Sequence, residues 1–135
     1  MILEFAFFAD TVEREADSQF SVTGGGRTIM RASAFPYTSP PLVLLYRIRF
    51  DEHEYGHTYP AMLLFLDQDR IIVGRTDTTF TVPHAAEAHR IMTFERPMQH
   101  ASFATPGLYT VVIMVDDHHL IELYLDVVQA DGPSQ

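Results

Sequence analysis

The sequence has no cysteine and no tryptophan, and it is poor in basic residues. Without cysteine the chain can form no disulfide, offers no thiolate ligand to zinc and has no cysteine nucleophile. Lysine and arginine together number 9 against 18 for aspartate and glutamate, which gives a formal net charge of −9. This acidic balance repels phosphate groups, so it argues against nucleic acid and anionic membranes as partners.

Long apolar runs are also missing. Residues 1–10 are apolar enough to suggest a signal peptide, but no basic residue opens the segment, and Glu4 and Asp10 interrupt it. Elsewhere no run approaches the ~20 apolar residues of a membrane helix. We therefore expect a cytoplasmic protein that does not enter a membrane.

The remaining composition is that of an ordinary globular protein, with 47% hydrophobic and 20% charged residues in a chain of 135. This length suits one domain with a core of its own. No internal repeat or low-complexity tract divides it. We expect a single domain over residues 1–130 and a flexible C-terminal tail over residues 131–135.

The most regular pattern lies near the C-terminus, where two strands over residues 106–127 are joined by a tight polar turn. Apolar side chains occupy every second position on both strands, a period that is typical of half-buried antiparallel strands. The residues on the two buried faces are Tyr109, Val111, Ile113 and Val115, and then Ile121, Leu123, Leu125 and Val127.

Comparable alternation predicts strands along most of the chain, and residues 47–66 are predicted to form a pleated hairpin with a polar loop over residues 51–57. One helical turn is expected over residues 83–89. The pattern predicts an all-β fold, a single antiparallel two-sheet β-sandwich of about 7–9 strands. The expected strands are residues 2–13, 19–23, 42–50, 58–66, 76–82, 90–94, 106–115 and 119–127, and residues 27–31 are a candidate for a further edge strand.

Pro106, Gly107 and Tyr109 favour an immunoglobulin-like sandwich. In such domains a tyrosine near the start of the penultimate strand bonds back to the preceding corner. The usual disulfide and buried tryptophan are absent, since the chain contains neither residue type. Tyr109 could equally be a core aromatic at a strand start, and a jelly-roll or C2-like sandwich is the alternative architecture.

Nine short motifs resemble a bacterial family of short, uncharacterised β-sandwich proteins, a domain of unknown function. The resemblance covers nearly the whole chain and implies the fold, not an activity. Two turns depart from the family pattern, because Arg70 and Asp117 stand where glycine is usual. The motifs are Asp10-Thr11-Val12, Phe35-Pro36, Arg47-Ile48-Arg49-Phe50, Glu54-Tyr55-Gly56-His57, Asp67-Gln68-Asp69, Phe80-Thr81-Val82-Pro83, Pro106-Gly107-Leu108-Tyr109, Val115-Asp116 and Val127-Val128-Gln129-Ala130.

Residues 53–57, His-Glu-Tyr-Gly-His, match the H-E-x-x-H pattern of zinc metalloproteases. That spacing works when a helix places both histidines on one face, with the glutamate as general base. Here extended segments flank the motif, and Gly56 and Pro60 disfavour a helix. A solvated loop is the main interpretation, and a metal site using His53 and His57 is the alternative.

A second candidate metal site is Asp116-Asp117-His118-His119. Aspartate and histidine can hold a divalent ion, but they also suit a tight turn. We therefore keep His118 and His119 as metal ligands only under the metal-binding alternative. No catalytic residue and no cofactor are predicted.

The sequence favours a non-enzymatic protein-interaction or structural module that binds a protein partner or itself. Segments 42–45 and 61–66 are apolar on both faces, whereas a sandwich normally exposes polar outer faces. The first alternative is a metal-binding protein or metal-dependent hydrolase using His53, Glu54 and His57. The second is a carrier of a small apolar ligand, held between the sheets in a pocket lined by phenylalanine and methionine.

Overall fold

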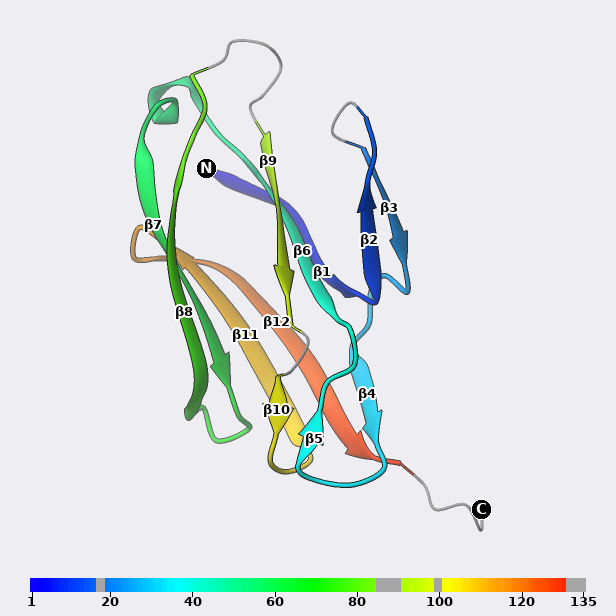
Figure 1. Ribbon diagram of the computed structural model, residues 1–135. Helices are drawn as coiled ribbons and strands as arrows, with labels where there is room; N and C mark the ends of the chain where they lie inside the picture. The colour runs from blue at the N-terminus through cyan, green and yellow to red at the C-terminus, as the bar shows by residue number, and fades with distance from the viewer. Residues whose placement is uncertain (17–18, 85–90, 99–100, 131–135) are drawn as a thin grey trace.

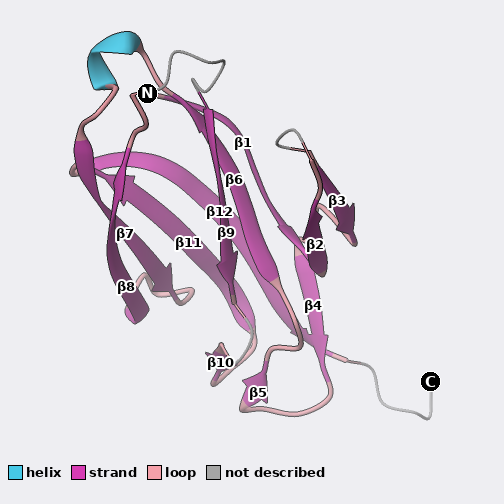
Figure 2. Cartoon of the chain, turned by 45° about the horizontal axis from the view of Figure 1, so that its top comes forward, coloured by secondary structure: helices cyan, strands magenta, loops and turns pink. Residues whose placement is uncertain are grey.

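The computed structural model describes residues 1–16, 19–84, 91–98 and 101–130 (Figure 1). Within these ranges the chain is almost entirely strand and loop, with one short 3-10 helix, η1 (Glu52–Glu54), and no α-helix (Figure 2). The predicted all-β class is confirmed. Residues 85–89 of the predicted helical turn and the predicted tail, 131–135, lie outside the described residues. No helix in the described part has the length and apolarity to cross a membrane.

The larger sheet has five strands. Its neighbouring strands are antiparallel except at one edge, where β4 runs parallel to β12. The strand order is β4 (Ile29–Ala32), β12 (His118–Gln129), β11 (Gly107–Val115), β7 (Thr58–Leu66) and β8 (Ile72–Thr81).

A second, antiparallel sheet has three strands in the order β1 (Ile2–Ala9), β6 (Val43–Arg49) and β9 (Ile91–Pro97). Two small antiparallel sheets complete the fold. The layout is therefore more complex than the two antiparallel sheets predicted. The small sheets pair β2 (Thr11–Arg14) with β3 (Phe20–Thr23), and β5 (Tyr37–Thr38) with β10 (Ser102–Phe103).

Both larger sheets contribute side chains to one hydrophobic core. Leu44 and Ile48 of β6 and Val111, Ile113 and Leu125 of the five-stranded sheet are almost fully buried in the same cluster. The predicted C-terminal hairpin is confirmed, since β11 pairs with β12 over its whole length with one bulge. β11 is not half-buried as predicted, because Thr110 and Val112 of its other face are only 3% and 5% exposed. Burial of the apolar faces removes apolar surface from water, which is the main favourable term for this arrangement.

The prediction of a hairpin over residues 47–66 is wrong. Both segments are strands, but β6 pairs with β1 and β9, whereas β7 pairs with β8 and β11. Residues 51–57 therefore connect the two sheets. The positions of the apolar side chains explain this connection between the sheets. Ile48 of β6 and Phe65 of β7 contribute to one core cluster from the two sheets, instead of lying side by side on one sheet.

The first predicted strand, residues 2–13, is broken at Asp10. The Asp10 carboxylate accepts hydrogen bonds from the Arg27 guanidinium at 2.9 and 3.1 Å, and the chain then turns into the β2–β3 hairpin. This hairpin lies against the outer face of the three-stranded sheet (Figure 1), where the Phe20 ring lies 6.0 Å from that of Phe5. Leu45 of β6, in the three-stranded sheet, is fully buried although it is not part of the core cluster.

The two turns without the usual glycine still adopt left-handed backbone conformations. Arg70 has φ = 64°, and Asp116 and Asp117 have φ = 51° and 64°. Around Arg70 the Asp67 carboxylate accepts the backbone N–H of two later turn residues at 2.9 and 3.0 Å. Local hydrogen bonding of this kind is how aspartate stabilises tight turns.

Candidate functional site

The histidine-containing loop does not form the helical arrangement of the metalloprotease motif. His53 lies in η1, while His57 follows Gly56, whose φ of 79° turns the chain. Among the described residues, the one group of three metal-ligating side chains with ligand atoms within 4.8 Å is Asp51, His53 and Glu54. His57 is not in this group, and its ring stacks on Tyr59.

Glu54 has a structural role in this loop. Its carboxylate is buried, accepts the backbone N–H of Asp51 at 2.9 Å and lies 2.9 Å from the Met1 ammonium. Burial raises the pKa of Glu54, but the hydrogen bonds from Asp51 and Met1 outweigh burial, and the net pKa lies below its ordinary value. Both oxygens are thus engaged in holding the connection between the sheets.

The second predicted cluster lies at the same end of the molecule as the first. His118 and His119 begin β12, and together with His53 and Glu54 they line one depression of about 470 Å³. The His119 imidazole lies 4.0 Å from the Glu122 carboxylate. Within the described ranges, the two segments contribute no joint set of ligand atoms close enough for one ion.

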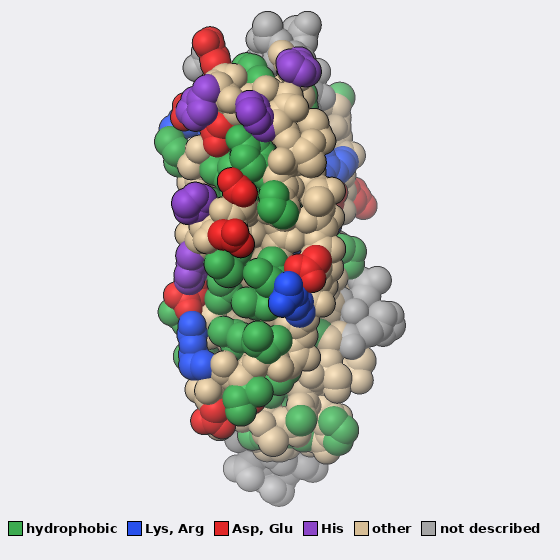
Figure 3. Space-filling view, turned by 90° about the vertical axis from the view of Figure 1, so that its left-hand side faces the viewer, with side chains coloured by type: hydrophobic (Ala, Val, Ile, Leu, Met, Phe, Trp, Pro, Cys, Tyr) green, Lys and Arg blue, Asp and Glu red, His purple; other side chains and the backbone are tan. Residues whose placement is uncertain are grey.

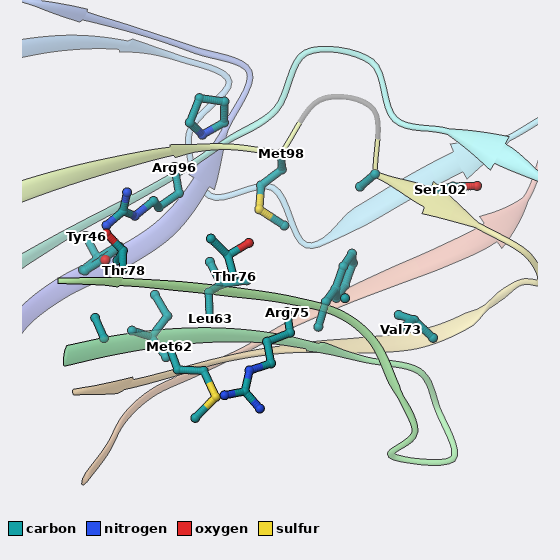
Figure 4. Close-up of a pocket in the computed structure, with 16 residues that line it drawn as sticks. Tyr46, Met62, Leu63, Val73, Arg75, Thr76, Thr78, Arg96, Met98 and Ser102 are labelled. Carbon is teal, nitrogen blue, oxygen red and sulfur yellow. The ribbon is translucent and has the colours of Figure 1, made fainter. Parts of the chain in front are cut away.

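A second cavity lies between the two larger sheets, where β7 and β8 face β9 (Figure 4). We call it the β8–β9 cleft, and its volume is about 540 Å³. Its apolar lining includes Leu63 and Phe65 of β7, Ile113 of β11, and Met98. Phenylalanine and methionine are the residue types that the ligand-carrier alternative predicts for such a pocket.

The polar lining of the β8–β9 cleft includes one arginine side chain, that of Arg96, and among the described residues no carboxylate lines it. Arg75 borders the cleft, but its side chain points away from it, to the outer face of the five-stranded sheet (Figure 4). Arg96 extends from β9 toward Tyr46 and Thr78 in Figure 4. Arg96 could not be predicted as a site residue from the sequence, because nothing local in residues 90–98 shows that β9 lies opposite β8.

The edge strand β8 is the second notable surface. Among the described residues it pairs only with β7, which leaves its other side as an open edge of the five-stranded sheet. Ile71, just before this strand, and Ile72 and Val73, its first two residues, are 60%, 54% and 51% exposed. Near its middle, the Arg75 guanidinium forms an ion pair with Asp77 at 3.0 Å.

The outer face of the five-stranded sheet carries further apolar side chains beside this edge. Met62 and Leu64 of β7 and Met114 of β11 are partly exposed there. Figure 3 looks at this side of the molecule and shows hydrophobic side chains gathered between charged ones. The apolar excess predicted over residues 61–66 therefore lies partly in solvent, unlike that of residues 42–45, where Leu45 is buried.

The residues predicted to be structural lie at the start of β11. The Tyr109 hydroxyl donates a hydrogen bond of 2.7 Å to the carbonyl oxygen of Thr105. Gly107 has φ = 152°, and a Cβ there would approach the Gln68 side-chain oxygen to 2.5 Å, so the position requires glycine. Pro106 is exposed beside it.

Comparison with known proteins identifies a family but no activity. No curated protein matches this chain. Residues 4–128 match the family of unknown function DUF6941, which is nearly the whole chain. The chain therefore belongs to the DUF6941 family, and its function is uncharacterised.

Proposed function

We propose that this protein is a non-enzymatic interaction module, an immunoglobulin-like β-sandwich that self-associates through the open edge of β8. Two observations support the immunoglobulin-like description: the larger sheets share one core, and the Tyr109 hydroxyl bonds back to Thr105 at the corner before β11. The net charge of −9 favours a protein partner over nucleic acid. A cytoplasmic location and a bacterial source stay predictions.

The open edge of β8 is the observation that carries this proposal. An edge strand presents unpaired backbone N–H and C=O groups, which another strand can pair with. Edges are commonly protected by charges, and β8 has two, Arg75 and Asp77. These two charges have opposite signs and lie two positions apart. Many other strands would place like charges opposite them, whereas an antiparallel copy of β8 places opposite charges there.

The order of these charges predicts the register of the pair. If two β8 strands run antiparallel about a two-fold axis at Thr76, Arg75 of each copy lies opposite Asp77 of the other. Both side chains lie on the outer face, because they are paired with Leu64 and Met62 of β7. Opposite charges in such cross-strand positions each contribute roughly 0.2–1 kcal/mol. Exposed residues 71–73 then lie opposite residues 79–81 of the second copy.

Charge exchange at the two positions tests this arrangement by sedimentation equilibrium. Wild-type protein is expected to dimerise. Arg75→Asp places two carboxylates opposite each other twice, and we expect dimerisation about tenfold weaker. Arg75→Asp combined with Asp77→Arg restores opposite charges across the two-fold axis and is expected to restore dimerisation. Circular dichroism checks that each variant is folded.

Arg49→Asp is the matched control, because Arg49 is an exposed arginine on the three-stranded sheet and lies 3.9 Å from Glu4. It makes the same change of net charge and is expected to leave dimerisation unchanged. The proposal fails if the wild-type protein stays monomeric up to about 1 mM. It also fails if the double exchange is as weak as Arg75→Asp alone.

A further inference from the structure

We infer that the β8–β9 cleft binds an anionic amphiphile, with a carboxylate head group on Arg96 and an aliphatic tail over the apolar lining. This inference concerns a ligand inside one copy and does not rest on the proposed self-association.

The size and lining of the cleft suit an aliphatic chain. Sites for small molecules usually have volumes of about 300–1,000 Å³ and mainly apolar walls with a few polar groups. The β8–β9 cleft, at about 540 Å³, falls in this range. Met98 and Leu63 (Figure 4) line it together with Phe65. Methionine in particular adapts to chains of different shape.

The charge of the lining selects the head group. The protein as a whole has a net charge of −9, yet among the described residues the one charged side chain that enters the cleft is the cation of Arg96. Arg75 is paired with Asp77, whereas Arg96 has no carboxylate partner in the part of the chain that the structure describes. A half-buried cation without a counter-ion is a favourable place for a carboxylate, which a guanidinium can bind through two parallel hydrogen bonds.

The guanidinium of Arg96 is already positioned for this role. Its central carbon lies 6.0 Å from the centre of the Phe94 ring, and the guanidinium forms a hydrogen bond with the Tyr46 hydroxyl. Burial raises the pKa of Tyr46, while Arg96 opposes this shift. Tyr46 therefore stays protonated at neutral pH. Because its oxygen accepts from Arg96, its own proton can be donated to a bound carboxylate.

Three ten-carbon probes separate the contributions of charge and tail. Decanoate, decanol and decyltrimethylammonium have the same chain with a negative, neutral and positive head group. Binding is followed by NMR of the methionine methyl groups, because Met98 lines the cleft. We expect decanoate to shift the Met98 signal saturably and to bind at least tenfold more tightly than decanol, and decyltrimethylammonium to bind more weakly than either.

Arg96→Gln removes the charge while keeping a polar side chain. It is expected to remove the preference for decanoate over decanol but to leave the binding of decanol unchanged. Arg96→Lys should keep part of the preference, and Arg49→Gln, remote from the cleft lining, should keep all of it. Two results would overturn the inference: no shift of the Met98 signal with decanoate, or a preference for decanoate that survives Arg96→Gln.

Discussion

Replacement of Tyr109 by phenylalanine is the most direct test of the corner that precedes β11. The change removes one hydroxyl group and leaves the ring in place. The ring packs in an aromatic cluster, with its centre 4.9 Å from that of Phe103 and 5.6 Å from that of Phe65. The variant therefore isolates the 2.7 Å hydrogen bond to Thr105 from the packing of the ring.

The expected loss is about 1 kcal/mol of unfolding free energy, the net value of a typical intramolecular hydrogen bond. Thr105 is exposed, so water can replace the lost donor at its carbonyl and keep the loss small. With an unfolding entropy of ~2.1 cal/mol/K per residue, 1 kcal/mol corresponds to about 3–4 °C for a chain of this length. Tyr109→Ala also removes the ring, and about 3–5 kcal/mol is expected.

Urea titration followed by circular dichroism measures both variants against the wild-type protein. Tyr124→Phe is the matched control, because Tyr124 is 49% exposed. It is expected to change the unfolding free energy by less than about 0.5 kcal/mol. If Tyr109→Phe is as stable as Tyr124→Phe, the hydroxyl does not hold the corner, and the immunoglobulin-like description loses one of its two supports.

Two further changes test the loop that contains Glu54 and the turn that contains Asp117. Because the folded-state pKa of Glu54 lies below its ordinary value of 4.5, its carboxylate stabilises the fold above that pH and loses this effect as the pH falls through the folded-state pKa. Glu54→Gln should therefore lower the melting temperature at neutral pH, and the melting temperature of the variant should decrease less than that of the wild-type protein as the pH falls. An unchanged melting temperature would show that the contacts with Asp51 and Met1 contribute nothing. Asp117→Gly should raise stability by up to about 1 kcal/mol, because glycine adopts a φ of 64° without steric conflict, whereas Asp69→Gly, at a residue without positive φ, should not.

The elements that could be predicted from sequence are those whose pattern depends on local burial. The strand predicted over residues 58–66 has the same bounds as β7, and the alternation around Val111 and Leu125 places the correct side chains in the core. Alternation records which face of a strand is apolar. It works here because β6, β7, β11 and β12 each turn one face to the same core.

Alternation does not record which strand lies beside which. The segments on either side of residues 51–57 were correctly predicted as strands. Their apolar pattern cannot distinguish a hairpin from a connection between two sheets, because both arrangements place the same apolar residues in a core. The parallel pairing of β4 with β12 is a second example, since residues 29–32 and 126–129 are far apart in sequence. Contacts of this kind depend on the whole topology, and one short segment carries no signal for them.

The same limit applies to the candidate sites. His53 and His118 were predicted separately, and only the positions of η1 and the β11–β12 turn bring them to one end of the molecule. Arg96 has no motif around it, and its importance comes from its place in the cleft opposite β8. A composition signal existed, since few basic residues are present, but it could not distinguish Arg96 from the other arginines.

One feature of the topology underlies both proposals. Because residues 51–57 cross from one sheet to the other, β7 lies between β8 and β11, which leaves β8 as an open edge and places it across the cleft from β9. A hairpin at this loop would instead pair β7 with β6 and fill the position that β9 occupies. The buried Glu54 carboxylate, the residue that suggested a protease, therefore matters through the connection that it stabilises, since both the edge and the cleft depend on that crossing.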